Sequence, residues 1–373
     1  MLSMAIDRRR FLAGLAAATV LPAQAARALG RDVTLYLTTA GTAGGGFEAV
    51  VLDRHGEPVC SAILPGRGHG GAWCPRRRHA VVFARRPGKF ALVLDPACGR
   101  AGAMILAPDD RHFYGHGVFS ADGNLLYTTE NDLARGRGVI GVWDAGAGYA
   151  RVGELDAGGI GPHDLALAGD GRTLVVANGG ILTHPDTGRA KLNVADMDPS
   201  LAFLDLATAR VDRRLRLARE FHKLSIRHVA LNGAGRIGVA LQDEGPKEDR
   251  SPLVLLSDGA RLDMCAAPED VTRRMKGYCG DVAMDAAGAA MAVSAPRGGL
   301  VTFWSVADGR YLAETAIADG CGVASAGGAG RFLLTGGTGA RTLVDLASGE
   351  ARTLAPAPGR RWDNHVLAVS ESR

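Results

Sequence analysis

The stretch GHGVFSADGNLLYTTEN, residues 115–131, decides the fold because the chain repeats its pattern. A histidine precedes an apolar run, a glycine-containing turn follows, and a second apolar run ends in small or polar residues. Two further clear copies are GPHDLALAGDGRTLVVANGG at 161–180 and IRHVALNGAGRIGVALQDEG at 226–245. Repeats of roughly 40 to 50 residues made of short strands are typical of β-propellers. The sequence therefore predicts an all-β propeller.

Weaker copies of the repeat set the number of blades. They begin at residues 67, 277 and 320, and an incomplete copy, NHVLAVS, begins at residue 364. The first apolar runs, 33–39, 47–53 and 59–64, supply three strands where a blade needs four. We predict that residues 365–369 supply the fourth, so that the C-terminal strand closes the ring by pairing with the N-terminal blade. The result is a seven-bladed β-propeller whose innermost strands begin near His69, His116, His163, His228, Asp281, Cys321 and His365.

The first residues have the pattern of an export signal. The motif DRRRFL at 7–12 contains a twin arginine, and the apolar stretch 12–21 is too short to span a bilayer. Small residues in an A-x-A arrangement follow at 23–28 and suit signal peptidase. We therefore expect residues 1–28 to be a twin-arginine signal peptide and residues 29–373 to be one propeller located in the periplasm.

Composition and cysteine spacing exclude several classes. The formal net charge is +4, and removal of the signal segment, with four arginines and one aspartate, leaves about +1, which offers no electrostatic basis for binding nucleic acid. No later stretch is apolar enough for a membrane helix, so we expect a mature chain that is not membrane-embedded. We also expect it to be a monomer. The six cysteines permit disulfides in an oxidising compartment, but no C-x-x-C-H motif exists to attach a c-type haem and zinc-finger spacing is absent.

The repeated histidines are the candidate functional residues. At the starts of innermost strands, they would converge from five blades on one mouth of the central channel. Neutral imidazoles in such an arrangement bind copper, zinc, iron or haem. Two alternatives stay open: a histidine at this position can instead fasten neighbouring blades, or the ring can bind an organic ligand. The candidate metal ligands are His69, His116, His163, His228 and His365.

The spacing within the repeats complicates this ring. His163 lies one residue out of register with His116 and His228, and such a slip turns a strand side chain to the opposite face. Asp164 and Asp281 match the two histidines instead, so we expect a ring that mixes imidazole with carboxylate. Cys279 and Cys321 share the same parity, and each is a soft ligand, a disulfide half or a small buried residue.

A long insert, residues 179–200, follows the second strand of the fourth blade. Long loops in compact domains are often functional. Second strands of neighbouring blades end in polar residues at the same level, so we expect the insert and these residues to rim the histidine-lined cavity. The candidate cofactor-binding residues are Asp164, Arg227, Glu130, Asn131, Asn178 and Gln242.

Several long phrases, among them RHFYGHGVFSADGNLLYTTEND, GIGPHDLAL and THPDTGRAKLN, resemble an exported bacterial family known as domain of unknown function 1513. The resemblance covers nearly all of the chain after the signal segment. It implies a twin-arginine-exported seven-bladed propeller, and members of the family tend to be encoded beside imelysin-like proteins and di-haem-type oxidoreductases. The partners implied are therefore periplasmic iron-handling proteins. More distantly, GPHDLAL and DGRTLVVANGG are similar to lactonase-type and nitrous-oxide-reductase-type propellers.

Three interpretations follow from these patterns. The first is a periplasmic propeller that binds iron, copper or non-covalent haem at the histidines and acts in metal acquisition. The second is a lactonase-like hydrolase, although neither a Ser-His-Asp arrangement nor a G-x-S-x-G motif is present, so an enzyme is not the favoured class. The third is a protein-interaction scaffold with structural histidines.

Overall fold

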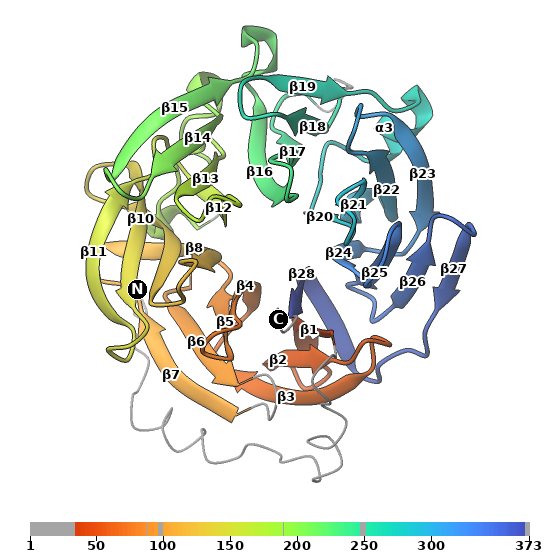
Figure 1. The fold of residues 1–373 in the computed structure, drawn as a ribbon, viewed down its shortest axis with the longest axis horizontal. Coiled ribbons are helices and arrows are strands. Elements are labelled where there is room, and N and C mark those ends of the chain that lie inside the picture. The colour runs from red at the N-terminus through yellow and green to blue at the C-terminus, as the bar shows by residue number, and fades with distance from the viewer. Residues whose placement is uncertain (1–33, 87, 96–99, 189, 247–250, 370–373) are drawn as a thin grey trace.

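Seven four-stranded antiparallel sheets surround a central axis, as Figure 1 shows. The structure is a computed structural model that describes residues 34–86, 88–95, 100–188, 190–246 and 251–369. The expected signal peptide, residues 1–28, and Cys98 lie outside the described residues. The predicted seven-bladed β-propeller is confirmed.

The blades are numbered here in chain order, each from its innermost strand outward. Blades 1 and 2 consist of β28 (Arg360–Val369), β1 (Leu35–Thr42), β2 (Phe47–Leu52) and β3 (Pro58–Leu64), and of β4 (Gly68–Cys74), β5 (His79–Ala84), β6 (Phe90–Asp95) and β7 (Arg100–Leu106). Blades 3 and 4 consist of β8 (Arg111–Phe119), β9 (Leu125–Asp132), β10 (Arg137–Asp144) and β11 (Ala150–Asp156), and of β12 (Pro162–Leu167), β13 (Thr173–Asn178), β14 (Ser200–Asp205) and β15 (Arg210–Arg216). Blade 5 consists of β16 (Leu224–Leu231), β17 (Ile237–Asp243), β18 (Val254–Ser257) and β19 (Leu262–Cys265). Blades 6 and 7 consist of β20 (Asp281–Met284), β21 (Ala290–Ala295), β22 (Leu300–Ser305) and β23 (Tyr311–Ala316), and of β24 (Gly320–Ser325), β25 (Arg331–Gly336), β26 (Arg341–Asp345) and β27 (Glu350–Thr353).

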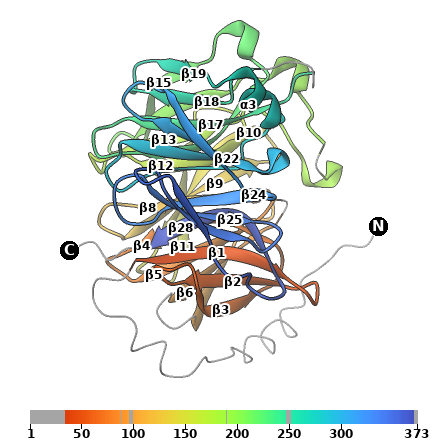
Figure 2. The same ribbon diagram turned by 90° about the vertical axis from the view of Figure 1, so that its right-hand side faces the viewer.

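The ring is closed by the two ends of the chain. Strand β28 pairs antiparallel with β1, with Leu35 opposite Val369 and Thr38 opposite Val366, and the two views in Figures 1 and 2 place the strands side by side. The closure confirms the expectation that the last strand completes the first blade. It begins earlier than residue 365, because β28 also pairs with the far end of β1, where Thr42 lies opposite Arg360.

Burial follows the position of a strand within its blade. Middle strands such as β13 and β21 are apolar and buried along nearly their whole length, because a neighbouring sheet covers each face. Between blades, Phe83 packs against Phe113 and Phe303 against Phe332. The outer strands β11 and β15 are largely exposed, and the arginines of β15 keep this edge from pairing with another chain.

The turns between first and second strands use glycine as the sequence predicts. Gly123 joins β8 to β9 with φ 72°, and Gly171 joins β12 to β13 with φ 65°. Residues with a Cβ rarely adopt this left-handed conformation, whereas glycine does so at little cost. Both turns therefore serve the fold and lie away from the chemistry.

Helical segments are short and lie in connections. They are α3 (Glu269–Arg274), η1 (Pro185–Thr187), η2 (Val194–Asp196), η3 (Arg219–Phe221) and η4 (Pro296–Gly298). The long connection that contains η1 and η2 leaves β13 and projects beyond the strands on one face (Figure 2). Within the described part of the chain, no helix is both long and apolar enough to cross a membrane.

Candidate metal centre

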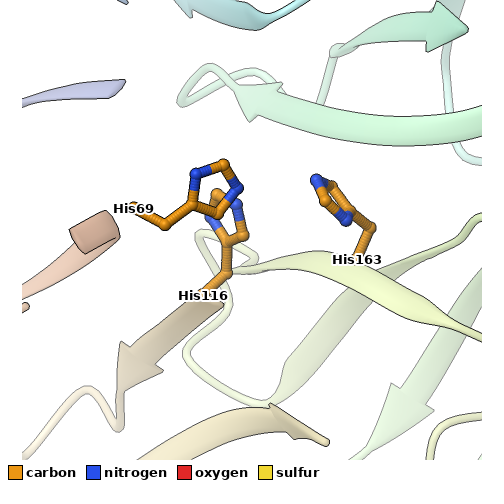
Figure 3. A group of neighbouring side chains, drawn as sticks. All are labelled: His69, His116 and His163. Atoms are coloured by element: carbon orange, nitrogen blue, oxygen red, sulfur yellow. The ribbon is translucent and has the colours of Figure 1, made fainter. Parts of the chain in front are cut away.

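Five imidazole rings meet on the axis of the propeller. They come from the innermost strands of blades 1 to 5: His365 on β28, His69 on β4, His116 on β8, His163 on β12 and His228 on β16. Nine pairs of ring centroids lie between 4.5 and 6.5 Å apart. Figure 3 shows three of them, His69, His116 and His163, gathered around one point.

Irregular strand pairing brings these side chains to the axis. The register shifts between Gly68 and Gly71 in β4, between Phe113 and Gly117 in β8, and between Pro162 and Asp164 in β12. A bulge of this kind re-aims side chains that strict alternation would send to opposite faces. This explains why His163 joins the ring although its spacing in the sequence predicts the opposite face.

Glycines allow the rings to approach each other. A Cβ on Gly115 would lie 2.5 Å from His69 Cδ2, and a Cβ on Gly70 would lie 2.7 Å from His116 Nδ1. Gly115 also has φ 108°, which strains any other residue. The G-H-G pattern around His69 and His116 is therefore a requirement of the crowded axis.

Two carboxylates orient two of the imidazoles and also join blades. Asp164 Oδ1 lies 3.2 Å from His116 Nδ1, and its Oδ2 accepts a hydrogen bond from the Val229 N–H of the next blade. Asp281 Oδ1 lies 2.9 Å from His365 Nδ1, and its Oδ2 accepts from the Val323 N–H. The expected mixture of imidazole with carboxylate is what the structure shows. Each aspartate thus joins blades both through its backbone contact and through the imidazole that it holds.

A third carboxylate, Asp363, lies beside His69. Its Oδ1 is 3.8 Å from His69 Nδ1, too far for a hydrogen bond, and 3.0 Å from Arg85 Nη1, while its Oδ2 pairs with Arg67. Burial opposes ionisation of Asp363, but His69 and the two guanidinium groups outweigh it and lower its pKa. Asp363 lies within β28, directly after Trp362, and the repeat pattern does not reveal this part of the site.

Four buried imidazole nitrogens have no hydrogen-bond partner in the described structure. They are His69 Nδ1, His116 Nε2, His228 Nδ1 and His365 Nε2. Buried polar atoms almost always have a hydrogen-bond partner, and a bound ion or water is a common reason for an exception. Four of the twelve such side-chain atoms in the described structure belong to this one cluster, and contacts with carboxylates account only for the opposite nitrogens of His116 and His365.

The electrostatics of the cluster favour neutral imidazoles around fixed negative charge. Burial is the main cause that lowers the pKa of His69, His163 and His228 well below the ordinary value. Burial also opposes the charged form of His365, but the Asp281 carboxylate outweighs it and raises the pKa of this ring. Neutral imidazole is the form that binds metals, so three of the rings have the required protonation state near neutral pH.

The pKa values of the two other carboxyl groups, Asp164 and Asp281, shift in opposite directions. Burial would raise the pKa of Asp164, but the His116 ring and the Val229 N–H outweigh it, so the pKa is lowered. Burial raises the pKa of Asp281, and the nearby Asp164 adds to this effect. The buried cluster therefore contains anionic carboxylate beside neutral rings, an environment that stabilises a cation.

Two sets of three histidines have the spacing of a metal site. In the set of His69, His116 and His163, and in the set of His116, His228 and His365, one ligand atom of each residue lies within 4.8 Å of the others. The second set is fully buried, and carboxylates hold two of its members by Nδ1. A carboxylate behind a ligating imidazole is the usual support of protein metal sites.

A cavity of about 290 Å³ opens beside the ring. His69, His163 and His228 form part of its wall. Its remaining lining comprises Arg85, Arg86, Tyr114, Lys191, Arg227, Gln242, Tyr278, Arg297 and Asn364. The imidazole cluster is thus accessible from one side through a strongly basic chamber.

The predicted cofactor-binding residues fall into two groups. Arg227 and Gln242 line the cavity, and Arg227 Nε donates to Gln242 Oε1 at 3.1 Å. Asp164 lies in the histidine cluster. The structure does not bring Glu130, Asn131 and Asn178 to the cavity wall.

These three residues instead hold neighbouring segments in place. Glu130 is fully buried inside blade 3, where it pairs with Arg151 at 2.7 Å. Asn131 donates to the Thr183 carbonyl, and Asn178 to the Ala157 carbonyl. Because side chains alternate along β9, Glu130 points into the blade. Polar residues at the ends of neighbouring strands therefore do not all face the cavity. The insert itself does reach the cavity, through Lys191.

The cysteines act as small buried residues. Among the described residues, Cys60, Cys74, Cys265, Cys279 and Cys321 form no disulfide. The Cys321 thiol donates to the Asp363 carbonyl at 3.1 Å, and the Cys279 thiol to the Leu253 carbonyl at 3.6 Å. For Cys279 and Cys321, the structure favours a role as small buried residues over a role as a soft ligand or half of a disulfide.

Several wall residues lie outside the repeat that drew attention to the histidines. Tyr114 precedes His116 within the bulge of β8, and Asn364 precedes His365. Arg85 and Arg86 follow β5, and Tyr278 and Arg297 come from connections in blade 6. The sequence did contain a signal for Arg85 and Arg86. They belong to the run ARR at the end of a second strand, like the polar residues at the ends of other second strands that the sequence singled out.

The fold and site define a class: a seven-bladed β-propeller with a histidine cluster at one end of its axis. Within that class, the chain belongs to the family described as "Protein of unknown function (DUF1513)", whose model matches residues 62–369. The resemblance noted in the sequence is thereby confirmed. The comparison with curated proteins gives no match.

Among solved structures, the chain is similar to the hydrazine synthase of Kuenenia stuttgartiensis. The TM-score is 0.60 at 15% sequence identity, and the match covers 84% of this chain and 90% of that chain. At this identity the similarity shows the propeller fold alone.

Proposed function

We propose that this protein binds one transition-metal ion through imidazole nitrogens on the propeller axis and acts in metal acquisition. The observation that carries the proposal is the cluster of four buried imidazole nitrogens without hydrogen-bond partners. Each buried nitrogen without a partner costs free energy, and a single ion coordinated by several of them would remove that cost.

The ligand set favoured by the structure is His116, His228 and His365. All three are buried, their ligand atoms lie within 4.8 Å of one another, and carboxylates orient His116 and His365. His69 and His163 lie on the side of the cavity and supply a second set with His116. Imidazole ligands suit copper, iron and zinc rather than magnesium or calcium.

The same geometry favours a bare ion over haem. Ring centroids of His116 and His365, and of His163 and His228, are only 4.6 Å apart. Rings packed edge to face at this distance leave no planar gap for a porphyrin between them. The favoured cargo is therefore an ion.

The setting of this activity is part of the same proposal. The twin arginine at residues 8–9 and the small residues at 23–28 support export to the periplasm by the twin-arginine route. Periplasmic iron-handling proteins, imelysin-like or di-haem-type, are the partners that the family resemblance suggests.

Titration of metal-free protein with copper(II), zinc and iron(II), followed by calorimetry, tests the ligand set. The double variant His116→Ala/His228→Ala should weaken metal binding by about a hundredfold or more while the protein stays folded, because two of three ligands are removed. His112→Ala is the matched control: His112 is also buried on β8, but its Nδ1 contacts the Phe113 carbonyl and it lies outside the ring. Equal metal affinity in the double variant and the control would overturn the proposal and leave the histidines as structural residues.

A further inference from the structure

The basic chamber beside the histidines has a charge that the metal proposal does not use. Five cationic side chains line it, from β16, the insert, η4 and the segment after β5, and no described carboxylate is part of the lining: Arg85, Arg86, Lys191, Arg227 and Arg297. Arg85 pairs with Asp363, and Lys191 pairs with Glu244. Arg227 and Arg297 are the cations that indicate a ligand.

Arg227 is the most informative of them. It sits inside the bulge of β16, directly before His228, and is partly buried in the cavity wall. Its Nε donates to Gln242 Oε1, and Gln242 Nε2 in turn donates to the Cys279 carbonyl at 2.9 Å, so the guanidinium is held in one orientation. No described carboxylate lies within ion-pair distance of Arg227. The Glu244 carboxylate, which pairs with Lys191, acts on Arg227 electrostatically without direct contact. A positioned, partly desolvated guanidinium without a direct ion pair is a site for an anion.

Two further groups on the wall point to the same chemistry. Arg297 stacks on the Tyr278 ring at 4.3 Å and makes no ion pair with a described carboxylate. Tyr114 is 3% exposed, and its hydroxyl has no hydrogen-bond partner in the described structure. A buried phenol that lines a basic cavity offers a hydrogen bond to an anionic ligand.

We propose that this chamber binds a small polycarboxylate anion. A volume of about 290 Å³ suits a compact organic acid. The cations come from four separate segments and are spread around the wall, which fits several separated carboxylates better than one compact phosphate. The guanidinium groups can each engage a carboxylate with two parallel hydrogen bonds.

The chamber shares its wall with the metal site. His69, His163 and His228 line it, so an anion held by Arg227 lies next to the imidazole cluster. A carboxylate oxygen would then meet the bound ion, and the protein would take its metal as a polycarboxylate chelate. This last step rests on the proposed function, whereas anion binding by the chamber does not.

The test is calorimetric titration of citrate into metal-free, untagged protein, with inorganic phosphate and glycerol as comparison ligands. Arg227→Gln should weaken citrate binding by about tenfold or more, because one charge-assisted contact is lost. Arg297→Gln, at an exposed position, provides a second variant that leaves the strands undisturbed. Arg310→Gln, in the exposed turn between β22 and β23, is the matched control and should bind as the parent does.

The outcomes separate this inference from the metal site. His116→Ala/His365→Ala, which changes two rings that do not line the chamber, should lose metal and keep citrate binding, whereas Arg227→Gln should keep metal binding and lose citrate. Citrate binding no tighter than glycerol binding, or unchanged in both chamber variants, overturns the polycarboxylate site. Phosphate binding as tight as citrate binding would also contradict it, because it would indicate a site for a compact oxyanion.

Discussion

Replacing Asp281 by asparagine separates the two tasks of that carboxylate. In the native protein, Oδ1 accepts from the Val282 N–H at 3.0 Å and contacts His365 Nδ1 at 2.9 Å, while Oδ2 accepts from the Val323 N–H at 3.0 Å. All of these neighbours donate, and an asparagine side chain has the same shape but only one acceptor oxygen. Its NH2 group must therefore face a donor.

The structure sets the size of both effects. Loss of one charge-assisted hydrogen bond in a buried place costs about 2 kcal/mol. For a domain of this length that corresponds to a fall in Tm of about 3 °C. A ligand imidazole that loses its supporting carboxylate typically loses metal affinity by about 10-fold to 100-fold.

The assay is thermal unfolding of the metal-free variant together with a metal titration of the folded protein. Asp285→Asn is the matched control, because Asp285 is also buried in blade 6 and accepts from the Ala289 and Gly330 N–H groups, but it touches no histidine. Both variants should lose stability, and only Asp281→Asn should lose metal affinity. Equal metal affinity in the two variants would refute the assignment of His365 as a ligand.

Three further predictions concern the surroundings of the site. Gly115→Ala should weaken metal binding by about tenfold or more, because φ 108° strains an alanine directly before the ligand His116 and its methyl group collides with His69. Gly235→Ala, with φ 78° and open space around it, should leave metal binding unchanged in the same titration. Glu130→Ala should lower the free energy of unfolding by about 1 to 3 kcal/mol, because it removes the fully buried carboxylate that Arg151 and Thr128 contact and leaves Arg151 with Glu154 alone, and denaturant unfolding should show this without a change in metal affinity. The pKa of the Cys279 thiol is raised by burial to about 12, so mass spectrometry should find it unmodified after native protein is treated with iodoacetamide at mildly alkaline pH, and modification at the rate seen in unfolded protein would contradict its buried placement.

The repeat pattern in the sequence predicts most of the fold. A histidine, an apolar run and a glycine turn recur because each blade needs the same innermost hairpin, so the number of blades and the closing strand followed from spacing alone. Strand starts were less accurate: β8 begins at Arg111 and β28 at Arg360, each about five residues before the histidine that marks the repeat. Bulges at these points interrupt the alternation on which spacing arguments depend.

The site was predictable only as far as it repeats. The five histidines lie near the starts of innermost strands, and Asp164 and Asp281 match the register of His116 and His228, so the sequence predicts that these side chains converge on the axis. His163 joins them through the bulge in β12. Asp363, Tyr114 and the basic residues of the chamber come from dissimilar segments, and only the tertiary structure brings them together. Glu130 was expected at the rim of the cavity, but alternation along β9 turns its side chain into the blade, where it pairs with Arg151 of β11.

Elemental analysis of protein produced from the full sequence and purified without a metal-affinity tag tests the central claim most directly. The account predicts close to one copper, iron or zinc ion per chain, lost in the His116→Ala/His228→Ala variant. Protein that contains no transition metal and takes up none on addition would contradict it, and the imidazole cluster would then be a device that holds the blades together.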